Sequence, residues 1–530
     1  MQNKIVENWL TNVGELTFTV PFCQLLLRQG KRVVHISSQG PMEQGKDVIA
    51  IDADGRVHCY QLKCGHITTN TWREIKGEID ELVELPPVHP SLPAKVDEWD
   101  AYLVTNGNIA NPAVRTIKDY SDAKQNKGHR PLKTIVEGEL VRDFTDCFGG
   151  FLPVEISDLQ VFLDLYNQPG DYSLDCGKFK QYLEAFFASH SGSSRQKKSE
   201  AIQASLILTS YLLTYKYAAE NRLDVIRAHT LLLASIYQFA AENNLKPSLY
   251  SGTERLAYEA IEIEFHQLID DLAAHPNSFV EAKYGLLSEA VTYKLRCTDL
   301  LGHMASYLSY CRILRRAPYR LTDIEAAMET LKGGNILVGE AAVPLLVNAY
   351  FTARASGKEQ EANERLAGLL GGILFANFNG RGLPSPYYSI TEAAEWQIGI
   401  AGDKVDEAFQ LKSYSLQTIL LLLARSSQRD VLANNWKIIS SLSMIEMVPD
   451  NPADYLTWRF NNGTQVDRFP GAPQSWASLV ADSKADYLNL LPAVLHDRRH
   501  FLPLFINAMP QRFNHKIALV LLDAIESVTS

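Results

Sequence analysis

The sequence predicts an α/β N-terminal domain, in which a mixed sheet is flanked by helices, followed by a large all-α region of irregular, solenoid-like helical repeats. Up to about residue 150, short β-type runs mix with helical patterns, whereas from about residue 155 nearly every strongly patterned segment has helical periodicity. The chain has 530 residues, and single cores seldom grow beyond about 250–300 residues. We therefore expect one domain over residues 1–150 and a helical region over 151–530, with a candidate sub-boundary in the Ser/Gly-rich segment near residues 188–200.

Local patterns define the N-terminal elements in chain order. Residues 47–52 and 56–63 are two β-rich runs separated by Ala53-Asp54-Gly55, and Asp-Gly is a strong turn signal between paired strands. These two strands are therefore expected to form an antiparallel hairpin. The other patterned segments predict helices over residues 3–12 and 20–29, a strand over 31–37, a helix over 72–85 and a strand over 99–107.

Long helical patterns fill most of the remaining chain and are separated by short breaks that contain Asn, Pro or Ser. No fixed period of 34 or 40 residues recurs, so the sequence does not predict one of the regular helical repeats. Residues 460–473 interrupt the helices and are expected to form a long loop. The clearest helical patterns cover residues 200–221, 225–244, 254–274 and 279–311.

Composition restricts the possible classes of protein. The net charge of −10 gives no attraction of the whole protein to nucleic acid, so any such contact must come from a local basic surface or a metal. Seven cysteines without a Cys-x-x-Cys pair fit neither a disulfide framework nor a zinc site. The longest apolar stretches fall well short of the roughly 20 residues that cross a bilayer, and no signal-peptide pattern is present, so a cytoplasmic location is expected.

Polar residues at the two outer ends of the predicted hairpin form the candidate site. Asp47 opens the first strand, and Gln61-Leu62-Lys63 closes the second. Successive strand residues point to opposite faces, so Gln61 and Lys63 share a face while Leu62 points into the core. Pairing outward from the turn brings Asp47 to the end of the second strand. Glu15 lies earlier, in a helical pattern.

These residue types match the needs of phosphodiester hydrolysis, which requires a hard cation, an activated water and a positive group near the developing charge. Asp47, the Gln61 amide oxygen and the Leu62 carbonyl would ligate the cation, with Glu15 acting through a ligand water. Oxygen ligands favour Mg²⁺ or Mn²⁺. Lys63 would orient the attacking water, help to deprotonate it and offset charge in the transition state. Gln61 carries less negative charge than a glutamate, a difference that Glu43 would compensate.

Three segments, Gln44-Gly-Lys-Asp-Val-Ile-Ala, Tyr60-Gln-Leu-Lys-Cys-Gly and Leu103-Val-Thr-Asn-Gly, together resemble the PD-(D/E)XK, or restriction-endonuclease-like, nuclease superfamily. The resemblance is to its Mrr-like branch with Gln-x-Lys and to related anti-phage defence nucleases, and it covers about residues 1–150. It implies a restriction-endonuclease-like sheet, metal ligands at Asp47 and Gln61, a catalytic lysine at Lys63 and a helix acid at Glu15. Without this context, the same residues would be read as an ordinary surface hairpin and a helix-surface charge.

A basic segment follows the predicted site and is a candidate phosphate-binding strip. Its alternative interpretation is a solvated basic loop, because charge clusters usually face water. Contacts of this kind favour affinity over sequence readout. The candidate nucleic-acid-binding residues are Arg115, Lys118, Lys124, Lys127, Arg130 and Lys133 in this segment, and Arg73 and Lys76 on the preceding predicted helix.

The combined expectation is a metal-dependent endodeoxyribonuclease effector of anti-phage defence, with DNA as substrate and the helical region as the sensing or assembly module. A defence-system partner protein or an activating signal would control it. Cutting opposed strands needs two sites, so at least a homodimer is expected. Two alternatives stay open: the same fold acting on RNA, and a catalytically silent, nuclease-like binding module that works through a protein partner.

Overall fold

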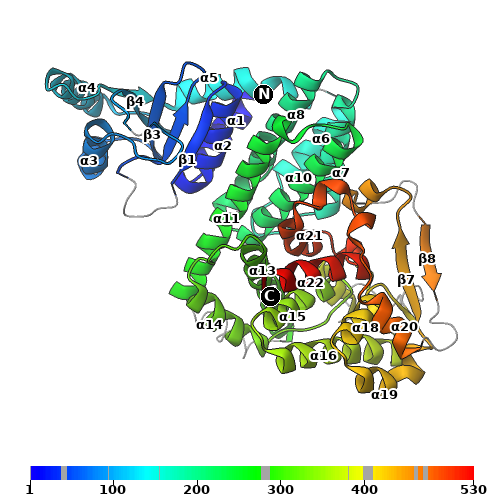
Figure 1. The fold of residues 1–530 in the computed structure, drawn as a ribbon. Helices are drawn as coiled ribbons and strands as arrows, with labels where there is room; N and C mark the ends of the chain where they lie inside the picture. The colour runs from blue at the N-terminus through cyan, green and yellow to red at the C-terminus, as the bar shows by residue number, and fades with distance from the viewer. Residues whose placement is uncertain are drawn as a thin grey trace. The chain divides into compact units, whose positions relative to one another are not determined.

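The computed structural model describes most of the chain, and Figure 1 shows its elements. The chain divides into two compact units: a first unit of residues 1–236 and 245–264, and a second unit of residues 237–244 and 265–530. Each unit is described by itself. The described residues are 2–37, 44–93, 95–153, 155–275, 287–379, 381–397, 410–458, 464–468 and 475–529.

A five-stranded mixed sheet lies at the centre of the N-terminal part of the first unit. Its strands are in sequence order: β1 pairs antiparallel with β2, β2 antiparallel with β3, and β3 and β5 each pair parallel with β4. The predicted hairpin is confirmed, with Val48 opposite Tyr60 and Ile51 opposite Val57. The strands are β1 (Arg32–Ile36), β2 (Val48–Ile51), β3 (Val57–Lys63), β4 (Trp99–Thr105) and β5 (Leu132–Ile135).

Helices pack against both faces of this sheet, with α2 and α3 on opposite sides (Figure 1). Cys59 of β3 belongs to the core cluster that contains Ile79 of α3. Its neighbour Tyr60 points the other way and meets the ring of Phe22 on α2, with ring centroids 5.2 Å apart. Alternate residues of β3 therefore face different helices. The helices of this part are α1 (Gln2–Asn12), α2 (Glu15–Arg28), α3 (Thr69–Glu84), α4 (Asn111–Asn126) and α5 (Glu137–Phe148).

The chain between residues 150 and 236 belongs to the same unit as the sheet. The Trp9 ring of α1 lies 5.3 Å from the Tyr211 ring of α8, and Arg28 of α2 forms an ion pair of 3.0 Å with Glu200. Contacts therefore connect the sheet-bearing part of the chain to helices that follow residue 150. The helices after residue 150 that lie wholly in this unit are α6 (Ile156–Tyr166), α7 (Cys176–His190), α8 (Arg195–Leu212) and α9 (Thr214–Ala218). Two further helices, α10 (Arg222–Glu242) and α11 (Ser251–Ala274), begin in this unit and end in the second.

The Ser/Gly-rich segment near residues 188–200 is a short turn between two helices and the start of the second helix. α7 ends at His190, and Ser194 caps α8 by accepting a hydrogen bond from the Lys197 backbone. Serine is a common N-cap residue, so the composition that suggests a linker also suits a helix start.

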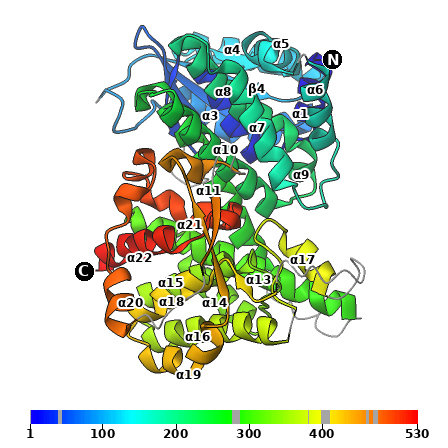
Figure 2. The ribbon, with the colours of Figure 1, turned by 90° about the vertical axis from the view of Figure 1, so that its right-hand side faces the viewer.

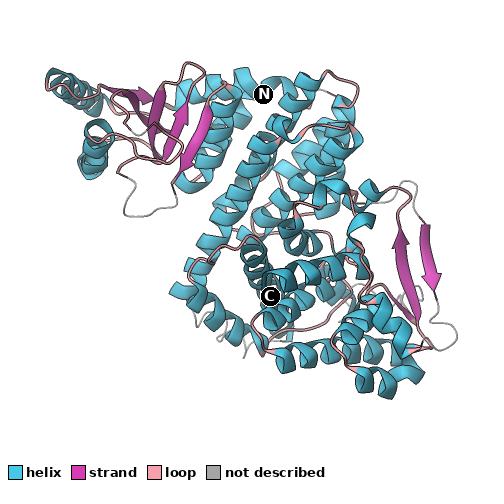
Figure 3. Ribbon diagram, viewed as in Figure 1, coloured by secondary structure: helices cyan, strands magenta, loops and turns pink. Residues whose placement is uncertain are grey.

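The second unit is mostly helical but is not all-α, and that part of the prediction was wrong. β6 (Lys412–Ser413), β7 (Ser443–Val448) and β8 (Thr464–Arg468) form a three-stranded sheet, and Figure 3 shows β7 and β8 side by side at the edge of the helices of this unit. Short apolar runs such as β7 cannot be assigned to strand or helix by periodicity. β8 lies inside the segment predicted to be a long loop.

Four consecutive helices of the second unit surround a pocket that is described below. α13 packs against α14 and α15, and α15 packs against α16. α13 and α15 lie next to each other in Figure 1, and Figure 2 shows the same helices turned by 90°. The helices of this unit are α13 (Leu287–Ile313), α14 (Leu321–Lys332), α15 (Ala342–Ala355), α16 (Glu359–Phe378), α17 (Ile390–Gln397), α18 (Leu416–Arg425), α19 (Arg429–Ile439), α20 (Trp476–Asp482), α21 (Leu502–Ala508) and α22 (His515–Thr529).

Across the described ranges, no helix combines the length and the apolar character needed to cross a membrane.

Candidate functional site

The hairpin brings Asp47 to the end of β3. The Asp47 backbone N–H donates to the Tyr60 carbonyl at 2.9 Å, which continues the β2–β3 pairing by one residue. The Leu62 backbone N–H donates to Asp47 Oδ2 at 2.6 Å. The structure thus places the Asp47 carboxylate directly beside the Gln61-Leu62-Lys63 segment.

Lys63 lies between two carboxylates that come from different helices. Its Nζ is 3.1 Å from Glu15 Oε1 at the start of α2 and 3.1 Å from Glu78 Oε2 on α3. Burial alone would lower the pKa of Lys63, but the charges and hydrogen bonds of Glu15 and Glu78 outweigh it and raise the pKa above its usual value. At neutral pH the side chain is therefore an ammonium held in one place.

The Gln61 side chain is buried, with 3% of its surface exposed. Its Nε2 donates to Glu78 Oε2 at 3.1 Å. Its Oε1 is buried and has no hydrogen-bond partner among the described residues. A buried amide oxygen without a partner costs free energy unless another group binds it, and amide oxygens are suitable ligands for Mg²⁺ or Mn²⁺. Gln61 Oε1 and the Asp47 carboxylate are both oxygen groups of the kind that a hard divalent cation prefers, and they lie on paired segments of chain.

We call the group of Glu15, Asp47, Gln61, Lys63 and Glu78 the Lys63 corner. Four of these residues were expected from the sequence, and Glu78 was not. Glu78 accepts hydrogen bonds from both Gln61 and Lys63, so it connects α3 to the end of β3. The available signal was its position on the predicted helix, one turn beyond the core residue Ile75. That spacing alone does not indicate which strand residue it meets.

The loop before Asp47 packs against the backbone of α3. Gly45 has a positive φ of 67°, and a Cβ there would lie 2.1 Å from the Glu78 carbonyl oxygen. The buried Lys46 ammonium donates to the carbonyls of Gln44 at 2.8 Å and Glu81 at 3.3 Å. Burial lowers the pKa of Lys46 to about 8. The Gly-Lys-Asp sequence thus fixes the entry to β2 against the helix that carries Glu78.

Asn106, directly after β4, connects the pieces of backbone that surround the corner. Its Oδ1 accepts from the Gly65 N–H at 2.7 Å, and its Nδ2 donates to the carbonyls of Leu10 at 2.7 Å and Val13 at 3.1 Å. Val13 lies two residues before Glu15. Asn106 therefore positions the start of α2 relative to the end of β3 without being part of the Lys63 corner.

We expect Asn106→Ala to destabilise the first unit and to loosen the contact between Glu15 and Lys63. The substitution leaves the Gly65 N–H and two carbonyls without this partner, and each lost buried partner costs about 1–3 kcal/mol. Urea unfolding measures the loss. Asn108→Ala is the matched control, because Asn108 is exposed and its side chain only donates to Glu137 at 2.7 Å. Equal stability of the two variants would contradict this role.

The predicted basic strip lies on α4, on the turn that follows it and on β5: Lys127 and Arg130 belong to the turn, and Lys133 belongs to β5. Three of its residues are engaged with acidic groups. Lys124 pairs with Asp80 and Glu84, Lys133 with Asp100, and Arg130 with Glu98. The exposed members without a strong ion pair are Arg115, Lys118 and Lys127, together with Arg73 and Lys76 on α3.

Two observations limit the possible ligand set of a metal. Among the described residues, no group of three or more His, Cys, Asp and Glu side chains is arranged to hold a metal ion. Glu43, the additional ligand expected from the sequence, lies outside the described residues. A metal at the Lys63 corner would therefore depend on Asp47, on the amide oxygen of Gln61 and on backbone oxygen.

A scan against family models found no match, and searches of curated proteins and of solved structures found none either.

Proposed function

We propose that this chain is a metal-dependent endodeoxyribonuclease effector and that the Lys63 corner is its active site. The observation that carries the proposal is the buried, unpartnered Oε1 of Gln61, which lies in the strand segment that contacts the Asp47 carboxylate and ends at Lys63. An acidic ligand, an amide ligand and a fixed cation are thereby gathered at one end of a strand pair. This is the set of groups that phosphodiester hydrolysis requires.

Asp47, Gln61 Oε1 and the Leu62 carbonyl would hold Mg²⁺ or Mn²⁺. When bound, such an ion stabilises negative charge on a phosphate and lowers the pKa of water. The chain contributes charge placement: Glu15 and Glu78 hold the Lys63 ammonium in one rotamer, from which it donates to a phosphate oxygen or orients a water. We assign Lys63 an electrostatic role, because its ammonium lies 3.1 Å from both Glu15 Oε1 and Glu78 Oε2 and is placed by them.

DNA contact is assigned to the exposed basic residues of α3, of α4 and of the turn that follows α4. In the sheet-bearing unit, Arg73, Lys76, Arg115, Lys118 and Lys127 remain exposed to solvent. Lys124, Arg130 and Lys133 contribute less, because acidic partners already offset their charge.

We expect the double substitution Arg115→Gln, Lys118→Gln to weaken DNA binding and to make it less salt-dependent. Each lost phosphate contact reduces the slope of log affinity against log salt by about one. Fluorescence anisotropy with a DNA duplex in EDTA, at a series of salt concentrations, measures the slope. Lys133→Gln is the control with little expected change, because Lys133 Nζ is already 2.8 Å from Asp100. If the slope is unchanged in the double variant, Arg115 and Lys118 do not contact DNA phosphates and DNA binds at another surface.

The biological setting follows by analogy with anti-phage effectors of similar organisation, because fold alone does not fix function. We assign the helical remainder of the chain to sensing or assembly, under control of a partner protein or an activating signal. Cleavage of both DNA strands calls for a homodimer or a larger assembly, since one site cuts one strand. Light scattering of the purified chain, alone and with DNA, tests this assignment.

A substrate panel tests the proposal. The full chain is incubated with supercoiled DNA, linear duplex DNA, single-stranded DNA and RNA, in Mg²⁺, in Mn²⁺ or in EDTA. The proposal expects cleavage of DNA in the metal-containing reactions alone. If only RNA is cleaved, the Lys63 corner remains the proposed active site but its substrate is RNA. This outcome is compatible with the site, because its groups would act on a phosphodiester and do not depend on the sugar.

The second candidate is a nuclease-like binding module without hydrolysis. Gln61 and the absence of three clustered acidic ligands in the described part of the chain favour it. If the native chain cleaves no substrate while Gln61→Glu gains metal-dependent cleavage, the native protein is a nuclease-like binding module rather than a nuclease. Cleavage by the native chain excludes it.

A further inference from the structure

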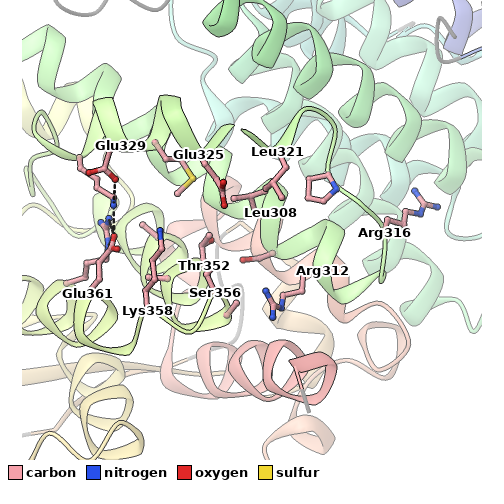
Figure 4. A pocket seen from close by; sticks show the side chains of 18 residues that line it. Leu308, Arg312, Arg316, Leu321, Glu325, Glu329, Thr352, Ser356, Lys358 and Glu361 are labelled. Carbon is pink, nitrogen blue, oxygen red and sulfur yellow. Dashed lines mark hydrogen bonds and ion pairs between the residues drawn. The ribbon is translucent and has the colours of Figure 1, made fainter. Parts of the chain in front are cut away.

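A pocket with a volume of about 310 Å³ lies in the second unit, lined by residues of α13, α14, α15 and α16 and by the turns that join them (Figure 4). Ligand sites for small molecules typically measure about 300–1,000 Å³. The pocket is therefore large enough for a small metabolite. Part of its wall is apolar, formed by Leu308, Pro318, Leu321 and Met328.

One side of the pocket is a closed ion-pair group. Lys332 Nζ lies 2.6 Å from Glu329 and 2.8 Å from Glu361, and Arg365 lies 2.8 Å from Glu361. Burial would raise the pKa of Glu361, but the hydrogen bonds and charges of Lys332 and Arg365 lower it to about 2. These four side chains largely neutralise one another.

One carboxylate and one ammonium of the lining remain available to a ligand. Arg312 and Arg316, the other arginines of the lining, already interact with other groups of the protein. The two remaining charged residues are Glu325 and Lys358, and neither side chain forms a hydrogen bond or an ion pair within the described parts of the chain. Both side chains are exposed to solvent. The pocket therefore offers a ligand one negative and one positive group.

Glu325 and Lys358 lie on different sides of the pocket. Glu325 belongs to α14, whereas Lys358 lies in the turn that joins α15 to α16. Figure 4 shows the two side chains on facing walls, each extending toward the space between them. A molecule with a single charge would be attracted by one of these groups and repelled by the other, whereas a molecule with both charges is attracted by both. The placement of the two groups thus favours a zwitterion and determines its orientation.

Ser309 supplies an independent indication of a ligand. Its side chain lines the pocket and is only 3% exposed, and its Oγ has no hydrogen-bond partner among the described residues. Thr352, another hydroxyl of the lining, is satisfied internally, because it donates to the carbonyls of Ala305 at 3.1 Å and Asn348 at 3.0 Å. A buried hydroxyl without a partner is costly, and a polar group of a bound ligand would remove that cost.

We propose that this pocket binds a small zwitterion of the amino-acid class with an apolar side chain. Glu325 accepts from the ammonium of the ligand and Lys358 donates to its carboxylate. Ser309 Oγ, which can both donate and accept, forms a further hydrogen bond to one of these two groups. The apolar side chain of the ligand packs against Leu308 and Met328. The inference is independent of the nuclease proposal, since it rests on residues of the second unit alone.

Calorimetric titration of the full chain tests the proposal, with L-leucine and L-phenylalanine as probes. EDTA is present throughout, so that a metal bound at the Lys63 corner does not contribute. Each amino acid is compared with two analogues that lack one charge: isocaproate and isoamylamine for leucine, hydrocinnamate and phenethylamine for phenylalanine. We expect at least one amino acid to bind at a single site and both of its analogues to bind at least tenfold more weakly, which is the usual cost of losing one hydrogen bond to a charged group.

Three variants assign the groups of the pocket to those of the ligand. Glu325→Gln is expected to weaken binding of the amino acid about tenfold but not to weaken binding of the carboxylate analogue, which has no ammonium. Lys358→Gln is expected to weaken binding of the amino acid about tenfold but not that of the amine analogue. Ser309→Ala should weaken binding about three- to tenfold without lowering the thermal stability, because the hydroxyl that it removes has no partner among the described residues.

Glu395→Gln and Lys437→Gln are the matched controls, since both residues are exposed, on α17 and α19, and do not line the pocket. Circular dichroism and thermal unfolding establish that all variants are folded. The proposal is overturned if neither amino acid binds, if an analogue that lacks one charge binds as tightly as its parent amino acid, or if the Glu325 and Lys358 variants bind like their controls.

Discussion

Replacing Asp47 with alanine is expected to abolish metal-dependent DNA cleavage, with a loss of about 1000-fold or more. The reason is that the Asp47 carboxylate, which accepts from the Leu62 N–H next to Gln61, is the proposed acidic ligand of the cation. Metal stabilisation of transition-state charge is worth several kcal/mol, and each 1.36 kcal/mol changes the rate about tenfold. Initial rates on supercoiled plasmid in Mg²⁺ measure the effect.

Asp47 also has a structural task that must be separated from its proposed chemical one. Its Oδ2 accepts from the Leu62 N–H at 2.6 Å, so alanine leaves that donor without its partner. Asp47→Asn keeps an oxygen that can accept this hydrogen bond and removes the negative charge. We expect Asp47→Asn to unfold at the same urea concentration as the native chain and still to lose most cleavage. Full activity of Asp47→Asn would contradict a ligand role for the carboxylate.

Replacing Lys63 with alanine is expected to reduce cleavage about 100- to 1000-fold, which is the usual cost of losing one group that stabilises transition-state charge. Unlike Asp47→Ala, it should retain Mn²⁺ binding, because Lys63 offers no lone pair while it is protonated. The variant therefore separates binding of the metal from catalysis. Cleavage rate and Mn²⁺ affinity, measured on the same preparation, give the two readouts.

Lys63→Arg is the matched control for charge. It keeps a cation near Glu15 and Glu78 but presents a wider, planar group. We expect partial recovery of cleavage relative to Lys63→Ala. Equal cleavage by the native chain and Lys63→Ala would reduce Lys63 to a structural ion-pair partner.

The structure offers a physical reason for glutamine at position 61. Glu78 Oε2 accepts from Gln61 Nε2 at 3.1 Å and from Lys63 Nζ at the same distance. A glutamate at position 61 would place a second carboxylate against Glu78, and like charges in a partly buried site repel. Gln61 of β3 is neutral, and Glu78 of α3 supplies a negative charge beside it.

The sequence was sufficient for features that depend on near neighbours. The hairpin followed from Asp54-Gly55 and the β-rich runs beside it, and strand pairing then placed Asp47 beside β3. Helices with clear periodicity, such as α3 and α10, were also found within a few residues of their bounds. In these cases the turn residues determine where the hairpin forms, and the spacing of apolar side chains determines where the helix lies. Neither depends on contacts that are distant in the sequence.

Features that depend on distant contacts were not predictable from the sequence. Glu78 joins the corner only because of the way α3 packs on β3, and Asn106 matters only because β4 ends beside the connection between α1 and α2. The strands β6, β7 and β8 are too short for a periodic signal. The pairing of Lys124 with Asp80 depends on the packing of α4 against α3, so the acidic partner of this lysine could not be found from the sequence.

The measurement that tests the central claim most directly is Mn²⁺ binding to the full chain, followed by electron paramagnetic resonance. It needs neither the correct substrate nor an activating signal. Binding removes the sharp spectrum of aqueous Mn²⁺, so the free ion is counted during a titration. We predict a saturable Mn²⁺ site in the native chain that Asp47→Ala removes and Lys63→Ala retains. A spectrum that stays that of free Mn²⁺ with the native chain, or binding that Asp47→Ala leaves unchanged, would contradict a metal site at the Lys63 corner.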